Sequence, residues 1–159
     1  GSTAAAFSGG QGDYTVEFEP GATALESEGA GFVVASLGVD SGYVPYTAFS
    51  AKESYINENS DLICAFTSAL QKGMEYVNSH DSTEIAKVIA PQFPDTDESV
   101  IAAIVERYHA QDTWKTDLIF TEDAYTLLLD ILEEAGQLSD RPAYEDLITT
   151  EFANKAVKK

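Results

Sequence analysis

Apolar and polar residues alternate in one short segment near the start of the chain. Tyr14, Val16 and Phe18 fall on one face of an extended segment, with polar residues between them. This period of two predicts a strand over 14–18. Pro20 follows and suits the first position of a helix, whose first turn leaves N–H groups unpaired anyway. We therefore expect a strand-to-helix corner at 18–21, with a helix that ends at Gly29.

Two further segments have the composition of strands. Residues 32–37 read Phe-Val-Val-Ala-Ser-Leu, which is typical of a strand buried on both faces of a parallel sheet. Residues 46–50 follow Pro45 and form a third candidate. With the helix between the first two strands, the order is that of a βαβ unit. The predicted fold class is α/β, with a sheet portion in residues 3–50 and a mainly helical region in residues 51–159.

Beyond about residue 52 the pattern takes a helical period. Apolar residues recur at steps of three and four, and a capping residue precedes each run. Asp81 and Glu84 have the spacing of a capping box, and Gly136 is placed to end the last long helix. The expected helix starts are Asn59 or Ser60, Asp81, Thr96 or Asp97, and Thr121.

The charge of the chain excludes several classes of partner. The 159 residues contain 27 Asp and Glu against nine Lys and Arg, which gives a net charge of -18. The basic residues are scattered singly and form no stripe, so nucleic acid and anionic membrane surfaces would be repelled. No run approaches the roughly 20 apolar residues that a membrane-spanning helix needs.

The residues that usually carry catalysis are sparse. Cys64 is the only cysteine and lies among apolar residues, which favours a buried structural role. His80 and His109 are far apart and have no metal-binding spacing. The glycines at 9, 10 and 12 precede a predicted strand, and no Lys-Ser/Thr pair follows them, so they do not form a phosphate loop. We predict no catalytic residue, no metal site and no cofactor.

The predicted elements are too few to close a fold. About three strands precede roughly a hundred residues of amphipathic helix, whereas a doubly wound sheet needs four or more strands. The chain reads as half of a larger fold. Uncovered sheet edges and apolar helix faces would then favour a homodimer or a swapped assembly.

The order of several short motifs suggests a family. The motifs are Gly-Gly-Gln-Gly-Asp-Tyr (9–14), Phe-Glu-Pro (18–20), Gly-Phe-Val-Val-Ala-Ser (31–36), Val-Pro-Tyr-Thr-Ala (44–48) and Ser-Tyr-Ile-Asn-Glu-Asn-Ser-Asp (54–61). This order resembles the solute-binding proteins of ABC importers, which have the periplasmic-binding-protein type II fold. The branch is the one related to thiamine-pyrimidine synthases and to the sulfonate, nitrate and taurine binders. The likeness covers only the C-terminal half of a typical member, and Ser60 stands where the family has proline.

The resemblance implies a location and a role. Residues 3–50 would belong to the second lobe, and residues 51–159 would be a helical region of the first lobe. The protein would be extracytoplasmic, either periplasmic or a lipoprotein anchored to the membrane, and would deliver a small molecule to an ABC permease without catalysis. The alternatives are an enzyme of pyrimidine or thiamine-precursor biosynthesis on the same scaffold, a binder of sulfonate, nitrate or taurine, and a helical protein-interaction module.

The candidate ligand-binding residues are Gln11, Phe18, Glu19, Tyr43 and Tyr46. Ligands bind beyond the carboxyl ends of parallel strands, where Phe18 and Glu19 would lie. Glu19 would repel anions and accept hydrogen bonds from an amine or aminopyrimidine, which favours a nitrogenous ligand over a sulfonate, nitrate or taurine. Its alternative role is to complement the helix dipole. Tyr43 and Tyr46 would stack on a flat ligand or pack at a hinge, and Gln11 would reach the cleft or form a turn.

Overall fold

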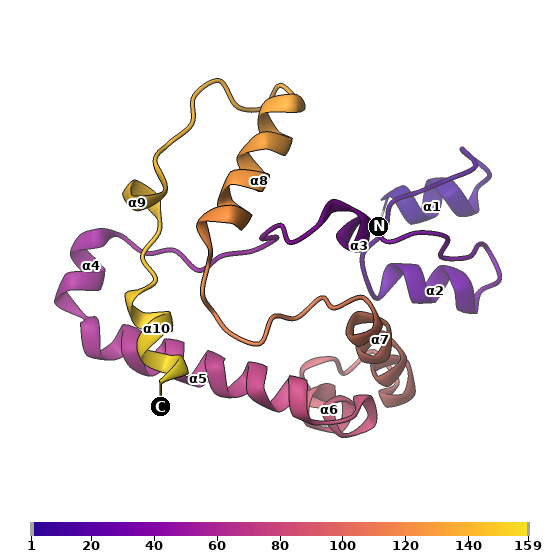
Figure 1. Cartoon of the computed structure of the whole chain (residues 1–159). Helices are drawn as coiled ribbons and strands as arrows, with labels where there is room; N and C mark the ends of the chain where they lie inside the picture. Colours follow the sequence, from indigo (N-terminus) through magenta and orange to yellow (C-terminus); the bar gives the residue numbers. More distant parts are fainter. Residues whose placement is uncertain (1, 159) are drawn as a thin grey trace. The chain divides into compact units, whose positions relative to one another are not determined.

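Helices account for all the regular secondary structure in the computed structural model, which describes residues 2–158 (Figure 1). The helices of the first half are α1 (Ser2–Ser8), α2 (Gly21–Ser27), α3 (Leu37–Ser41), α4 (Glu53–Glu58) and α5 (Ser60–Ser79). Those of the second half are α6 (Ser82–Ile89), the short 3₁₀ helix η1 (Ala90–Gln92), α7 (Glu98–Ala110), α8 (Glu122–Glu134), α9 (Tyr144–Leu147) and α10 (Glu151–Val157). No strand occurs between residues 2 and 158.

The predicted α/β fold is therefore wrong. Residues 14–18 and 46–50 are irregular, and so are 32–36, while Leu37 already begins α3. An extended segment becomes a strand only when a neighbour pairs with its main chain, and none of these segments pairs with another described one. The expected βαβ unit, and with it the sheet portion of a periplasmic-binding-protein-like fold, is absent from the described residues.

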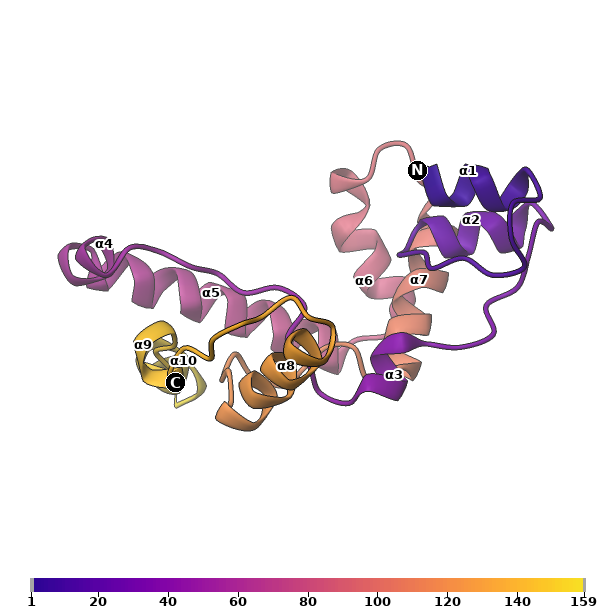
Figure 2. The same ribbon diagram turned by 90° about the horizontal axis from the view of Figure 1, so that it is seen from above.

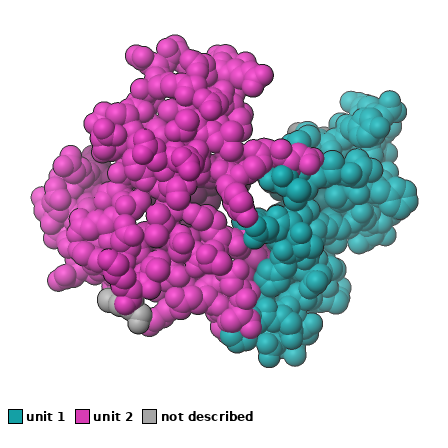
Figure 3. All heavy atoms as spheres, in the orientation of Figure 1, with its two compact units in different colours: residues 1–39, 80–113 teal, residues 40–79, 114–159 magenta. Residues whose placement is uncertain are grey.

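The chain divides into two compact units (Figure 3). Unit 1 contains the residues up to Val39 together with His80–Thr113. Unit 2 contains Asp40–Ser79 together with the residues from Trp114 onward. Each unit thus joins segments that are distant in sequence. The expected division into residues 3–50 and 51–159 concerns the lobes of a larger protein and stays a prediction.

Unit 1 is centred on the pairing of α6 with α7, and α1 lies beside α2 (Figures 1 and 2). Its core contains the adjacent Ile85 and Ala86 of α6 together with Ile101 and Val105, which lie four residues apart on α7; all four are buried, whereas Val88 of α6 is exposed. Asp81 caps α6 as expected, because its Oδ1 accepts the N–H of Glu84 at 2.9 Å. Helix α7 begins directly after Asp97, another predicted helix start.

Unit 2 is organised by α5, on which α10 lies in both views (Figures 1 and 2). Phe152, Ala153 and Ala156 of α10 are buried. Gln71, in the middle of α5, is also buried and donates to the carbonyl of Thr116 at 3.2 Å. A buried amide needs such a partner, so this bond fixes the loop before α8 against α5.

Three aromatic rings pack α8 against the segments on both sides of it. The Tyr125 ring packs edge-on against both Phe120 and Tyr144, at centroid distances of 6.2 and 5.6 Å. Its hydroxyl donates to the carbonyl of Pro142 at 2.9 Å, and the Tyr144 hydroxyl donates to the carbonyl of Phe120. Burial raises the pKa of the Tyr144 hydroxyl above its ordinary value, and the charge of Glu122 adds to this effect.

Two glycines end helices where the sequence predicts. Gly29 and Gly136 have φ of +68° and +66°, a left-handed conformation that favours glycine. After α8, the N–H of Gly136 bonds to the carbonyl of Glu133 and the N–H of Gln137 to that of Leu132, which is the Schellman pattern. The predicted stops of α2 and α8 are both confirmed.

Among the described helices, none is at once long enough and apolar enough to cross a membrane.

Replacing Ile85 tests the core of unit 1. Its side chain is 2% exposed, so Ile85→Ala leaves a cavity and should lower the free energy of unfolding by about 2–5 kcal/mol. The matched control is Val88→Ala on the same helix, whose side chain is 60% exposed and whose effect should stay within about 0.5 kcal/mol. Urea denaturation followed by helical circular dichroism measures both. Equal losses for the two variants would contradict the assignment of this core.

Candidate functional site

The candidate site lies at the corner that leads into α2. The Glu19–Pro20 peptide bond is cis, and Gly21 begins the helix. The Glu19 side chain is only 5% exposed. Its Oε2 accepts the N–H of Thr23 at 3.0 Å, so the carboxylate caps the first turn of α2. The structural role weighed for Glu19 from the sequence is thus present.

Arg107 of α7 joins this corner to the rest of unit 1. Its Nη1 donates to Glu19 Oε1 at 2.7 Å, and its Nη2 donates to Glu26 Oε2. The other oxygen of Glu26 accepts the N–H of Val33 at 2.9 Å. We call Glu19, Glu26 and Arg107 the Arg107 cluster. It places two carboxylates on one guanidinium and so carries a formal charge of -1.

The hydrogen bonds of the Arg107 cluster shift the pKa of Glu26. The N–H of Val33 and then the Arg107 guanidinium hold the pKa of this carboxyl below its ordinary value, because both stabilise the charged form. Charge-assisted bonds of this kind are the stronger ones in proteins. The cluster is therefore a fixed arrangement of charges.

Two further polar atoms are buried near this corner. Glu17 Oε1 and Thr23 Oγ1 have no hydrogen-bond partner among the described residues. Glu17 folds over Gly21, where a Cβ would lie 3.2 Å from Glu17 Oε2. The face of residues 15–19 that is turned toward the rest of unit 1 is thus rich in carboxylates.

The structure distributes the predicted site residues over both units. Gln11, Phe18 and Glu19 belong to unit 1, whereas Tyr43 and Tyr46 belong to unit 2. Gln11 is exposed, and its backbone N–H bonds to the carbonyl of Ala6 at 2.9 Å, at the turn that ends α1. Phe18, Tyr43 and Tyr46 all have exposed side chains. The ligand-binding role of these five residues stays a prediction.

Sequence reasoning missed Arg107 and Glu26. Arg107 is 88 residues from Glu19 and 81 from Glu26. Partners this far apart leave no local sequence pattern, because an ion pair between distant segments has no fixed spacing in the sequence. The only hint is that Arg107 is one of nine basic residues in an acidic chain and would be expected to have a carboxylate partner.

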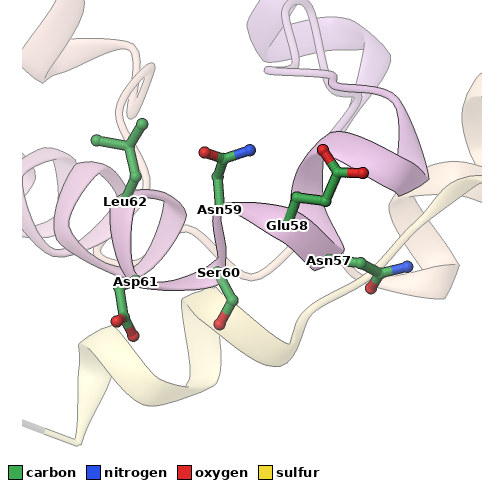
Figure 4. Close-up of a pocket in the computed structure, with 6 residues that line it drawn as sticks. All are labelled: Asn57, Glu58, Asn59, Ser60, Asp61 and Leu62. Carbon is green, nitrogen blue, oxygen red and sulfur yellow. The ribbon is translucent and has the colours of Figure 1, made fainter.

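Unit 2 contains a hollow at the junction of α4 and α5. It has a volume of about 420 Å³ and is lined by Asn57, Glu58, Asn59, Ser60, Asp61 and Leu62 (Figure 4). The side chains of Ser60 and Asp61 point to the side opposite those of Asn59 and Leu62 (Figure 4). Because these polar groups do not converge, the hollow offers no set of donors and acceptors around one ligand.

In the described part of the chain, no three His, Cys, Asp or Glu side chains are grouped as metal ligands.

Comparison with known proteins gives one informative relative. The chain is 39% identical over 150 residues to a Bacillus subtilis (strain 168) protein named "Putative binding protein YtlA". The match covers 94% of this chain but 45% of that protein, so the chain spans less than half the length of its relative. No protein-family model matches the chain. No solved structure is similar to it.

The relative narrows the functional class. Its name describes binding and no reaction, which agrees with the prediction of a binding protein at that general level. The importer branch, the ligand and the location are not part of that name.

Removing the Arg107 guanidinium should destabilise unit 1. Arg107→Leu leaves the buried Glu19 carboxylate without its ion-pair partner, so the free energy of unfolding should fall by roughly 1–3 kcal/mol. Arg141→Leu is the matched control: it also removes one positive charge shared by two carboxylates, but from ion pairs with Asp130 and Glu133 in which all three side chains are exposed. Urea denaturation should show a much smaller effect for the control. Similar effects would mean that only net charge matters.

The lowered pKa of Glu26 gives unit 1 an acid-sensitive contribution to its stability. A depressed pKa in the folded state stabilises the fold above the unfolded-state pKa, which is about 4.3 for a glutamate, and this contribution is lost as the pH falls through the folded-state value. Glu26→Gln should therefore reduce stability at pH 7 and have little effect near pH 3. Urea midpoints at both values measure this difference. Glu28→Gln, at an exposed neighbouring position, is the charge-matched control, and an equal pH dependence in both variants would refute the assignment.

Proposed function

We propose that this chain is part of an extracytoplasmic solute-binding protein that supplies a small nitrogenous molecule to an ABC importer. The observation that carries the proposal is the 39% identity, over nearly the whole chain, to a protein named as a binding protein. The motif order from Gly9 to Asp61 supports the importer branch, because it resembles that of such binding proteins. A periplasmic or membrane-anchored location and a membrane permease as partner follow from the same resemblance.

The charges of the Arg107 cluster support a nitrogenous or cationic ligand. A lone guanidinium at this corner would favour a sulfonate or nitrate, but two carboxylates already share Arg107. With the nearby Glu17 the local formal charge becomes more negative. An anion approaching this corner would be repelled, whereas an amine, a pyrimidine or a thiamine precursor would find acceptors.

Exposed aromatic rings occur among the predicted site residues of each unit. Tyr43 and Tyr46 of unit 2 flank Val44 and Pro45, and their rings are 68% and 79% exposed. In unit 1, Phe18 precedes Glu19, and Gln11 has a neutral amide that donates and accepts. A flat ligand that stacks on an aromatic ring gains both apolar contact and a favourable electrostatic geometry. In this proposal the Phe18 ring stacks on the ligand, and Glu19 accepts hydrogen bonds from its N–H groups.

A ligand screen by thermal unfolding tests the proposal. The chain and the intact Bacillus subtilis relative are each heated with 4-aminopyrimidine, thiamine, spermidine or taurine. Binding to the folded state raises stability by about 2.7 kcal/mol at a hundredfold excess over Kd. We expect a nitrogenous compound to raise the melting temperature and taurine to leave it unchanged.

Two variants connect the result to the proposed residues. Glu19→Gln should weaken binding of the nitrogenous compound at least tenfold, while Glu28→Gln, which removes the same charge from an exposed position, should not. Stabilisation by taurine alone would reject the nitrogenous ligand. If neither protein responds to any compound of these classes, the small-molecule function proposed here fails.

A further inference from the structure

The segment that leads into the corner has its apolar face turned outward. Tyr14, Val16 and Phe18 are 82%, 63% and 63% exposed, whereas Thr15, Glu17 and Glu19 between and after them are half-buried or buried. The period of two predicted from the sequence is thus present, but its polarity is the reverse of that of an ordinary surface segment. We call Tyr14, Val16 and Phe18 the apolar row.

A second segment of unit 1 exposes large apolar side chains in the same way. Phe32 is 84% exposed and Val34 is 75% exposed. The segment is held at its start, because a Cβ at Gly31 would lie 2.7 Å from Cε1 of Phe7 on α1, and the N–H of Val33 bonds to Glu26. The side chains of Phe32 and Val34 are therefore exposed on a segment that is fixed to the unit at two points.

The main chain beside the apolar row is also available. Residues 13–17 make no backbone-to-backbone hydrogen bond with any described residue. Backbone N–H and C=O groups need partners once water is removed. A covering element must therefore bring main-chain donors and acceptors together with apolar side chains, as an extended polypeptide does when it docks along another. A small molecule or a smooth apolar surface would leave these groups unpaired.

We propose that the apolar row is covered by an extended, alternately apolar polypeptide segment, and that this segment belongs to a part of the protein that corresponds to the unmatched part of the relative. More than half of that protein has no counterpart in the 159 residues, although the match covers almost all of them. A contiguous exposed apolar surface of this kind marks an interaction site. The partner is thus the remainder of the same type of binding protein, and this inference does not depend on the ligand proposed above.

Charge argues against a second copy as the occupant. Each copy carries a net charge of -18, and the exposed Asp13 lies directly before the apolar row. Two copies meeting along this row would bring carboxylates together, which is unfavourable at low ionic strength. The occupant should therefore be neutral or basic beside its apolar residues. The homodimer or swapped assembly expected from the sequence becomes the competing outcome of the test.

A chimera tests the proposal. In it, the matched 150 residues of the Bacillus subtilis relative are replaced by this chain, and the rest of the relative is kept. Hydrogen exchange of the amides of residues 13–17 is measured in the chimera and in the chain alone. We expect exchange to be at least tenfold slower in the chimera, and the chain alone to sediment as a monomer with fast exchange in this segment.

Substitutions inside and outside the apolar row provide a second test of the proposal. Val16→Asp should lower the melting temperature of the chimera by several degrees and leave that of the chain alone unchanged. Val88→Asp introduces the same charge at a position of unit 1 with nearly the same exposure, 60% against 63%, and should affect neither protein.

Three results would overturn the proposal. The first is equally fast exchange of residues 13–17 in a folded chimera and in the chain alone. The second is a dimer of the chain alone that protects these amides and is broken by Val16→Asp. The third is a chimera that fails to fold while the intact relative folds, because the unmatched part would then not recognise this chain.

Discussion

One guanidinium group connects the two parts of the sequence that form unit 1. Arg107 lies on α7, in the later segment, and binds Glu19 and Glu26 on either end of α2, in the earlier one. The apolar core of the unit combines Leu25 of α2 with residues of α6 and α7, and the ion pairs add to it an interaction that depends on the orientation of α2. The guanidinium group holds its N–H donors in a rigid plane and binds both carboxylates at once. It therefore fixes the orientation of α2 better than the ammonium group of a lysine would.

This ion pair also decides which face of residues 14–19 points inward. Glu19 can reach Arg107 only if its side of the segment faces the unit, and the period of two then turns Thr15 and Glu17 the same way. The apolar residues between them must face outward. The buried carboxylates and the exposed rings are therefore two consequences of one arrangement. It stabilises unit 1 through charge and leaves apolar surface uncovered, which an isolated domain rarely does.

Structural features that depend on neighbouring residues could be predicted from the sequence, whereas features that depend on residues distant in sequence could not. The cap at Asp81 and the stops at Gly29 and Gly136 are local, since each is a bond between residues a few positions apart. The predicted strands at 14–18 and 32–37 have the right alternation or apolar content, but pairing needs a second segment, and residues 2–158 place none beside them. The ion pairs of Arg107 could not be predicted either. Its partners Glu19 and Glu26 lie 88 and 81 residues earlier, and no motif around them indicates an arginine partner.

Glu19 at the candidate site was predicted either to accept hydrogen bonds from a ligand or to complement the dipole of the following helix. Both of its oxygens already accept hydrogen bonds, one from α2 and one from Arg107. A ligand at this corner would have to share the remaining lone pairs of Glu19 or bind beside the Arg107 cluster, where its field still acts. Selection by charge needs no direct contact, so a fixed cluster with an excess of carboxylate can disfavour anions while it holds the fold together.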